Sequence, residues 1–446
     1  METGFRFIHA ADLHLDSPFR GVSDAPETVA AGLRESTFAA LRNLTELAIA
    51  EEADFIVLSG DLYDAADRSL RAQLALCREW QELGKRGIQV FVIHGNHDPL
   101  SGARAQLELP GTVTVFGASA PEGRPAFRRD GTLAAYVYGI SYETRSVTDN
   151  LASRYVRRSD GFFHIAMLHA NVDGHPAHDP YAPCKLDELA GAGFDYWALG
   201  HIHERKVLHE YPHVVYPGNT QGRNPRETGE KGCYIVDVSA SREVKLTFVP
   251  LDTIRWVRSE LDIGGLASEQ QAAEAMFRLA EQAAASHRGR NIMLKLVLIG
   301  RGVLHPRFRT SAALADLSSE LRERLSGLHD GTWIWAYALE AATAAELNDG
   351  QLLEEDSFAG ELYRLVNALN RNPERREAFI GEALTSLAEH PKLRRLMKDR
   401  DAGSEDRWDR AAALALEWLT AEEADEVIAS SAIPETSGRG EGGAGR

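Results

Sequence analysis

Short apolar runs alternate with longer amphipathic segments in the amino-terminal part of the chain. Three runs, at residues 5–10 (FRFIHA), 54–59 (DFIVLS) and 88–94 (IQVFVIH), have the length and composition of buried strands. Between the first two, small and apolar residues recur with the spacing of one helix face, at Leu33, Thr37, Leu41, Leu44 and Ala48. Strands that alternate with helices in this way predict an α/β domain.

Further apolar runs follow at shorter intervals as far as residue 250. They read VTVFG, AAYVYGIS, FFHIAMLH, FDYWALG, HVVYPG, GCYIVDV and VKLTFV. Fewer helical segments separate them, so we expect this part of the sheet structure to be more antiparallel.

The alternation restarts near residue 251. The runs RWVRSELDI, IMLKLVLIG and TWIWAYALE enclose helical segments at 269–285 and 314–325, which predicts a small α/β domain over residues 251–347. Residues 348–433 are helical and highly charged, and we expect the glycine-rich end, residues 434–446, to be disordered. With residues 1–250 as the first domain, the chain has the two or three domains expected for its 446 residues.

Composition predicts a protein of the cytoplasm without membrane association. No apolar run approaches the roughly 18 residues of a membrane span, and the first residues lack the pattern of a signal peptide. The three cysteines are far apart and odd in number. We therefore expect reduced, structural thiols and neither disulfides nor a cysteine zinc site.

The net charge of −17 disfavours a polyanionic partner, because affinity for nucleic acid comes largely from lysine and arginine. The charge is unevenly distributed, however. From Asp401 onward there are 11 acidic and 4 basic residues, a net charge of −7. Two bound divalent cations would also add +4 at one place.

Polar side chains follow the predicted strands. They form five clusters: Asp12-Leu-His14, Gly60-Asp61, Gly95-Asn-His-Asp98, His169, and Gly200-His-Ile-His203. The carboxyl ends of strands in an open α/β sheet meet at one edge, so these clusters should converge. Aspartate, histidine and asparagine can bind divalent metals without cysteine. A central carboxylate such as Asp61 can bridge two cations, and paired cations clamp the oxygens of a phosphoryl displacement.

The motifs DLH, GD, GNHD, H and GHIH, in this order, resemble the calcineurin-like metallophosphoesterase superfamily. The opening HAADLHLDSPFRG is similar to its DNA repair exonuclease branch, the SbcD-type nucleases. HDPYAP, YWALGHIH and YPGNTQGRNPRETGEKGC are similar to a bacterial subgroup of that branch. The resemblance is strong over residues 5–250 and weak beyond. It implies a four-layer α-β-β-α metallophosphoesterase sandwich with a small α/β capping domain and a helical C-terminal region.

Carried over position by position, the resemblance implies two divalent metal ions, with Mn2+ expected. One ion would be held by Asp12, His14, Asp61 and His203, and the second by Asp61, Asn96, His169 and His201. His97 would stay off the metals, free to protonate the leaving 3′ oxygen or to stabilise the transition state, with Asp98 as a candidate for orienting its ring. Some related nucleases carry a histidine after the GD motif where this chain has Asp64, which leaves the balance of exonuclease and endonuclease activity open.

Other histidines and basic residues have two interpretations. His9, His94, His164, His209 and His213 match no ligand position, and we expect them to be structural. His175 and His178, in the polar loop after His169, could contact substrate or serve the loop alone. Arg223, Arg226 and Lys231 lie in a glycine-rich loop that could cradle phosphate or form a solvated turn. For the basic runs 371–376 and 392–400 we expect a charged outer helix face.

The resulting hypothesis is a two-metal, Mn-dependent DNA exonuclease or endonuclease in DNA repair. Its expected partners are DNA and an SbcC-like coiled-coil ATPase, with a homodimer as a candidate assembly. The helices after residue 348 would dock that ATPase or pack on the cap. Alternatives are a phosphatase or small-molecule phosphodiesterase of the same fold, which would not need the extra domains, and a non-catalytic scaffold, which would not need every ligand position filled.

Overall fold

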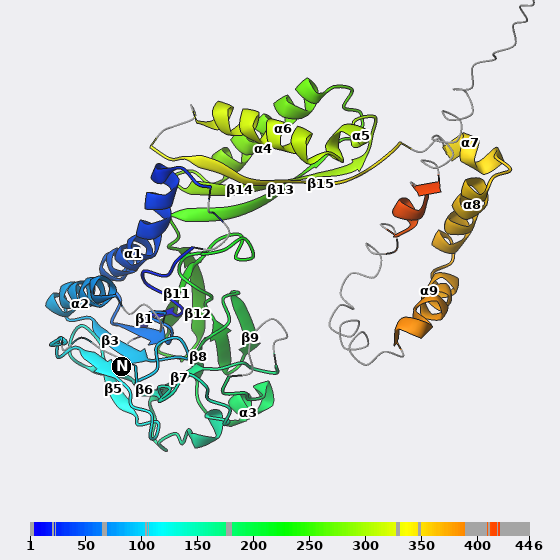
Figure 1. Ribbon diagram of the computed structural model, residues 1–446. Coiled ribbons are helices and arrows are strands. Elements are labelled where there is room, and N and C mark those ends of the chain that lie inside the picture. Colours follow the sequence, from blue (N-terminus) through cyan, green and yellow to red (C-terminus); the bar gives the residue numbers. More distant parts are fainter. Residues whose placement is uncertain are drawn as a thin grey trace, which may run out of the picture. The chain divides into compact units, whose positions relative to one another are not determined.

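A computed structural model describes residues 4–19, 22, 24–64, 69–102, 105, 107–174, 181–326, 331–346, 349–388, 408, 411–416 and 418–419 (Figure 1). The chain divides into two compact units. The first comprises Met1–Ser259, Ala275–Leu296 and Leu317–Leu339, and the second comprises Glu260–Glu274, Val297–Asp316 and Glu340–Arg446.

The first sheet contains the three strands predicted at the amino terminus. They are β1 (Phe5–Ala10), β2 (Phe55–Ser59) and β3 (Gln89–Ile93), and they pair in parallel with each other and with β4 (Val113–Val115). On the other side of β1, the antiparallel strands β11 (Gly232–Val238) and β12 (Val244–Pro250) complete the order β12-β11-β1-β2-β3-β4. The carboxyl ends of β1, β2 and β3 therefore lie at one edge, as predicted.

Helices α1 (Glu27–Ala50) and α2 (Leu70–Lys85) cover one face of the first sheet (Figure 1). Leu41 and Leu44 of α1 share a buried core with Ile8 and Ile56 of the sheet. The helical spacing predicted around these leucines is thus the spacing of the buried face. Ser69 is the N-cap of α2, and its hydroxyl accepts a hydrogen bond from Ala72 N at 3.0 Å.

The second sheet contains β5 (Arg124–Phe127), β6 (Leu133–Gly139), β7 (Phe163–His169), β8 (Tyr196–Gly200), β9 (Lys206–Glu210) and β10 (His213–Tyr216). Its order is β5-β6-β7-β8-β10-β9, and the four central strands are parallel. Our expectation of a more antiparallel arrangement is therefore wrong for these strands. The β6–β7 connection contains the short helix η2 (Ala152–Arg154), the β7–β8 connection contains α3 (Leu186–Gly191), and the β8–β10 connection contains the edge strand β9, so each pair has the crossover that parallel strands need.

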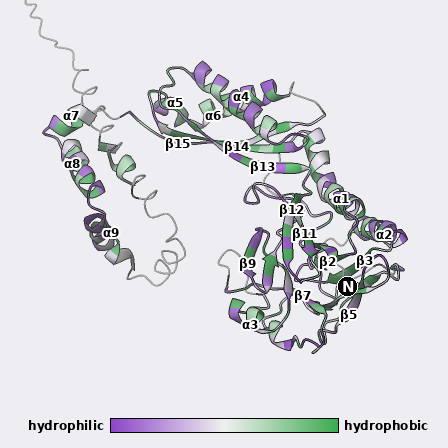
Figure 2. Ribbon diagram, turned by 180° about the vertical axis from the view of Figure 1, so that it is seen from behind, coloured by the Kyte–Doolittle hydropathy of each residue, from purple (hydrophilic) through white to green (hydrophobic). Residues whose placement is uncertain are grey.

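The two sheets pack face to face around an apolar core. Phe7 stacks on Phe55 with ring centroids 5.2 Å apart, and Tyr196 of the second sheet meets Phe7 edge-on at 5.2 Å. Figure 2 shows that the strands are largely hydrophobic. A separate core that includes Leu189 of α3 and Trp197 of β8 lies on the outer side of the second sheet. These layers confirm the predicted α-β-β-α sandwich.

A third sheet has the order β13-β14-β15. Its strands are β13 (Ile254–Asp262), β14 (Asn291–Arg301) and β15 (Ile334–Ala344), accompanied by α4 (Glu269–Ser286), α5 (His305–Phe308) and α6 (Ser311–Leu325). The helices predicted at 269–285 and 314–325 correspond to α4 and α6.

The predicted helical region after residue 348 contains α7 (Asp349–Glu354), α8 (Phe358–Asn370) and α9 (Pro373–Ala388). The basic run 392–400 and the glycine-rich end 434–446 lie outside the described residues. Cys77, Cys184 and Cys233 are buried, free thiols. None of the helices formed by described residues combines the length and the apolar character required to cross a bilayer.

Candidate metal centre

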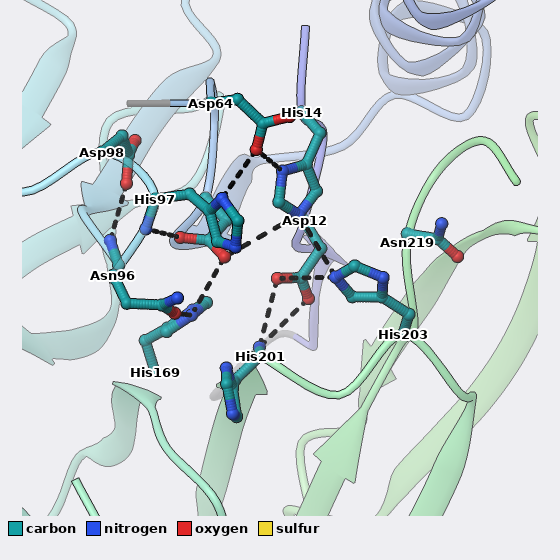
Figure 3. Close-up of polar contacts among 12 residues, drawn as sticks. Asp12, His14, Asp64, Asn96, His97, Asp98, His169, His201, His203 and Asn219 are labelled. Atoms are coloured by element: carbon teal, nitrogen blue, oxygen red, sulfur yellow. Dashed lines mark hydrogen bonds and ion pairs between the residues drawn. The ribbon is translucent and has the colours of Figure 1, made fainter. Parts of the chain in front are cut away.

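The polar clusters that follow the strands converge at the carboxyl edge of the two sheets (Figure 3). Asp12 and His14 follow β1, Asp61 follows β2, Asn96 and His97 follow β3, His169 ends β7, and His201 and His203 follow β8. The six residues Asp12, His14, Asp61, Asn96, His169 and His201 are buried. Burial of so many ionisable groups requires compensating partners.

One group of donors consists of Asp12, His14 and His203, whose ligand atoms all lie within 4.8 Å of one another. The Nε2 atoms of His14 and His203 are 3.2 Å apart, and His203 Nε2 lies 4.0 Å from Asp12 Oδ1. Two ring nitrogens and a carboxylate that face one point form a donor set for a divalent cation.

A second group consists of Asp12, Asp61 and His169. His169 Nε2 lies 3.3 Å from Asp61 Oδ2 and 2.9 Å from Asn96 Oδ1. Asp61 Oδ2 is also 3.7 Å from His14 Nε2. Asp12 belongs to both groups, and the Asp61 carboxylate lies near a ring nitrogen of each, as a bridging ligand would.

His201 contributes through its backbone. Its N–H donates to both carboxylate oxygens of Asp12, at 3.2 and 3.1 Å. Its ring packs against those of His169 and Tyr181, with centroids 5.3 and 5.8 Å away, and belongs to none of the three donor groups found among the described residues, the third being His14, Asp64 and His97. A metal-binding role for the His201 ring stays a prediction.

Three candidate ligand histidines are fixed through their other ring nitrogen. His169 Nδ1 lies 2.9 Å from Ser59 O, His14 Nδ1 lies 2.9 Å from Asp64 Oδ1, and His203 Nδ1 lies 2.8 Å from Glu227 Oε1. Carbonyl and carboxylate oxygens accept, so each Nδ1 must carry the hydrogen. This tautomer leaves Nε2 available to a cation, as in many metal sites.

Electrostatics at the centre also favour bound cations. Burial raises the pKa of Asp12 to about 6. Burial opposes the charged form of His169, but the charge and hydrogen bond of Asp61 and the charge of Asp12 raise its pKa to about 9. The buried carboxylates thus draw positive charge to this position. Burial lowers the pKa of His14 to about 3, which leaves its Nε2 without a proton.

Local backbone geometry is strained where the ligands lie. Asp12, His14, Asp61 and His201 have φ of 54°, 43°, 52° and 97°, in the left-handed region that favours glycine. Such conformations cost about 1 to 3 kcal/mol each and cluster at functional sites. A Cβ at Gly95 would collide with Asp61 Oδ1 and lie 2.6 Å from His169 Nε2, so only glycine fits there.

Asp64 holds the His97 ring, with Oδ1 2.7 Å from His97 Nδ1. The Asp64 carboxylate also accepts from His14 Nδ1 and from Ser17 Oγ. Burial opposes protonation of His97, but the hydrogen bond to Asp64 and the charges of Asp61 and Asp64 outweigh it and raise the pKa of His97.

The prediction that Asp98 orients His97 needs correction. Asp98 Oδ2 lies 2.8 Å from His94 Nδ1 and accepts from Leu62 N at 3.0 Å, and Oδ1 accepts from Gly95 N at 2.7 Å. The turn after β3 directs this carboxylate toward the backbone. Asp98 therefore fixes the two loops that carry Asp61 and Asn96.

Of the remaining candidate residues, the structure describes Arg226 and Lys231 but not the two loop histidines. His175 and His178 lie outside the described residues. Arg226 is exposed, and its backbone N–H donates to Asn224 Oδ1 at 3.0 Å. Lys231 Nζ donates to His203 O at 3.1 Å. The contact of Glu227 with His203 was not predicted, because nothing in the sequence distinguishes Glu227 from the other charged residues of its loop.

Comparisons with known proteins agree with this geometry. A family model described as calcineurin-like phosphoesterase matches residues 5–205, and one described as the middle domain of metallophosphoesterase YhaO matches residues 256–344. The chain is 38% identical to the uncharacterized metallophosphoesterase YhaO of Bacillus subtilis, over 89% of this chain and 93% of that protein.

Two relatives carry names from DNA metabolism. The chain is 29% identical to the DNA double-strand break repair protein Mre11 of Thermoplasma acidophilum, over 50% of this chain and 61% of that protein. It is 25% identical to the D component of the nuclease SbcCD of Escherichia coli, over 48% of this chain and 60% of that protein. The matched regions thus leave more than a third of each of these two relatives uncovered.

Proposed function

The chain belongs to the calcineurin-like phosphoesterases, and on that premise we propose that it is a metal-dependent nuclease that hydrolyses phosphodiester bonds of DNA in repair. The proposal depends above all on the position of Asp61, whose Oδ2 lies 3.7 Å from His14 Nε2 and 3.3 Å from His169 Nε2. A carboxylate placed in this way can bridge two cations.

The donors fit two divalent ions, with Mn2+ as the ion that the resemblance to SbcD-type nucleases implies. We assign Asp12, His14, Asp61 and His203 to the first ion and Asp61, Asn96, His169 and His201 to the second. When bound, the ions would supply Lewis acidity and a hydroxide nucleophile. The protein's own contribution is to hold these donors at fixed spacing, through the hydrogen bonds to Ser59 O, Asp64 and Glu227.

His97 is the proposed general acid. Hydrolysis forms a bond from a water oxygen to phosphorus and breaks the bond to the 3′ oxygen, which then needs a proton. The raised pKa of His97 favours the protonated ring that a general acid needs, and Asp64 fixes the ring through Nδ1. The opposite nitrogen, Nε2, is then the one that donates to the leaving oxygen.

DNA as the substrate is supported by the names of the relatives, a DNA double-strand break repair protein and a component of a nuclease. On the same likeness we propose an SbcC-like coiled-coil ATPase as partner, a homodimer as a candidate assembly and the cytoplasm as location. Among basic loop residues, Arg226 is an additional candidate for contact with the DNA backbone, since its side chain is exposed.

A small phosphate ester is the second candidate substrate. The net charge of −17 favours it, because a polyanion would be repelled outside the immediate surroundings of bound cations. The same donors and the same His97 would act on either substrate.

The test is incubation of the purified protein with labelled linear duplex and single-stranded DNA, with Mn2+ and with chelator. His97→Ala and Asp61→Asn are assayed alongside, with His209→Ala on the edge strand β9 as a matched histidine control. We expect degradation that requires the metal, survives His209→Ala and is lost in the other two variants.

Bis-p-nitrophenyl phosphate separates the two substrate classes. Turnover of this ester without DNA cleavage would favour the second candidate. A folded protein that hydrolyses neither would contradict the catalytic proposal and favour a scaffold.

A further inference from the structure

The loop at residues 217–231, between β10 and β11, is built onto the candidate metal centre. The buried Glu227 carboxylate accepts from Arg223 N at 2.7 Å and from Asn219 Nδ2 at 2.9 Å, and lies 2.8 Å from His203 Nδ1. One side chain thus joins the backbone of the loop to a candidate metal ligand. The backbone of Arg223 is therefore fixed to the same carboxylate as the ring of His203.

The loop is also fixed from the start of β13. Gln221 Oε1 accepts from Thr253 N at 2.9 Å, and Gln221 Nε2 donates to Ile254 O at 2.7 Å. Trp256 Nε1 donates to Gly222 O at 3.0 Å. A Cβ at Gly222 would lie 2.7 Å from Glu227 O and 3.0 Å from Trp256 Cδ1, so the chain passes there in close contact. The backbone on both sides of Arg223 is therefore preorganised.

The Arg223 side chain reaches the group that holds His97. Its Nη1 donates to Asp64 Oδ2 at 3.2 Å, while Asp64 Oδ1 lies 2.7 Å from His97 Nδ1 and 2.9 Å from His14 Nδ1. The guanidinium is thus connected through one carboxylate to the proposed general acid and to a proposed metal ligand.

Arg223 retains unused hydrogen-bonding capacity at this position. Its side chain is only 14% exposed, and its Nε is buried with no hydrogen-bond partner among the residues that the structure describes. A guanidinium has five N–H donors in a planar fork, and phosphate oxygens match that geometry. A purely structural ion pair with Asp64 would not require a guanidinium on the same carboxylate that holds the His97 ring.

We propose that Arg223 binds the phosphate group of the substrate, donating to a non-bridging oxygen beside His97, while Asp64 and Glu227 hold it in place. This inference rests on the proposed function, since it names the residue that receives the phosphate at the same centre. Arg223 would neutralise charge on the phosphate as displacement proceeds, in addition to the bound ions.

Inorganic phosphate is the probe that tests this role. Its inhibition of Mn-dependent hydrolysis of bis-p-nitrophenyl phosphate is measured for the wild type, Arg223→Gln and Arg223→Lys. We expect Arg223→Gln to raise both the inhibition constant and KM about tenfold or more, as for a lost charged hydrogen bond, and Arg223→Lys to recover part of this. Arg129→Gln is the control, because Arg129 pairs with Glu52 near the amino end of β2.

Loss of kcat with an unchanged inhibition constant in Arg223→Gln would overturn the inference, because Arg223 would then only position Asp64. Calorimetric titration of the Mn-loaded proteins with phosphate gives a second readout that needs no turnover. If the wild-type protein showed no hydrolysis, the proposed function would be contradicted. The inference itself fails if the wild type binds no phosphate or if Arg223→Gln binds it equally tightly.

Discussion

At the scale of single residues, Asp64 joins the parts of the candidate centre. Its carboxylate is shared by His14, His97 and Arg223, which are a proposed ligand, the proposed acid and the proposed phosphate-binding residue. Sequence comparison with SbcD-type nucleases only marks Asp64 as a departure, because the motif there ends in histidine. The role of Asp64 follows from the direction in which its side chain points, and this direction cannot be predicted from the sequence.

Asp64→Asn should lower kcat by about two orders of magnitude, because an amide holds the His97 ring less well than a carboxylate and general acid catalysis is worth at least that much. The variant should also shift the alkaline limb of the pH–kcat profile. Asp64 helps to raise the pKa of His97 against the effect of burial, so its removal lowers that pKa and His97 loses its proton at lower pH. The measurement is kcat between pH 5 and 10 for bis-p-nitrophenyl phosphate, a range that extends to both sides of the ordinary histidine pKa of about 6.5.

Asp130→Asn is the control for Asp64→Asn, since Asp130 lies exposed in the turn between β5 and β6, where its carboxylate accepts from Thr132 N and Oγ1. A profile for Asp64→Asn that superimposes on the wild type after scaling would contradict the link between Asp64 and His97.

At the scale of elements, the sequence predicts strands and ligand placement better than it predicts pairing. The strands ending before Asp12, Asp61 and Asn96 follow from short apolar runs, and their parallel order brings these residues to one edge. The parallel order of β6, β7, β8 and β10 could not be predicted, because the described parts of their crossovers hold only the short helices η2 and α3 and the strand β9, which give no long helical periodicity. For the same reason the contact of Glu227 with His203 had no sequence signal, as loop geometry alone creates it.

The loop after β3 depends on glycine at position 95. Gly95→Ala should lower the affinity for Mn2+ by about 10- to 100-fold, the loss typical when groups that support metal ligands are disturbed, because the added Cβ would displace Asp61 and His169. Calorimetric titration with Mn2+ measures the effect. The control is Gly161→Ala, where a Cβ meets no described atom within 4 Å. Equal Mn2+ affinity in both variants would show that Asp61 and His169 do not hold the ion.

At the scale of the whole molecule, the division of labour between the metal centre and the C-terminal helices can be tested. The described contacts of the centre join residues between Asp12 and Glu227, all within the first compact unit. Helices α7, α8 and α9 belong to the second unit, and of the two roles predicted from the sequence we take docking of the partner ATPase as the one to test.

A variant that ends after Glu346 should therefore keep its Mn-dependent turnover of bis-p-nitrophenyl phosphate and lose association with the ATPase in co-purification. β15 ends at Ala344, so the truncation leaves the third sheet intact. Thermal unfolding of the variant controls for folding. If a folded variant lost turnover of this small ester, the C-terminal region would have to act on the centre itself, since the substrate needs no docking surface. If turnover and co-purification both persisted, the helices would serve neither catalysis nor the partner, and packing within their own unit would be their role.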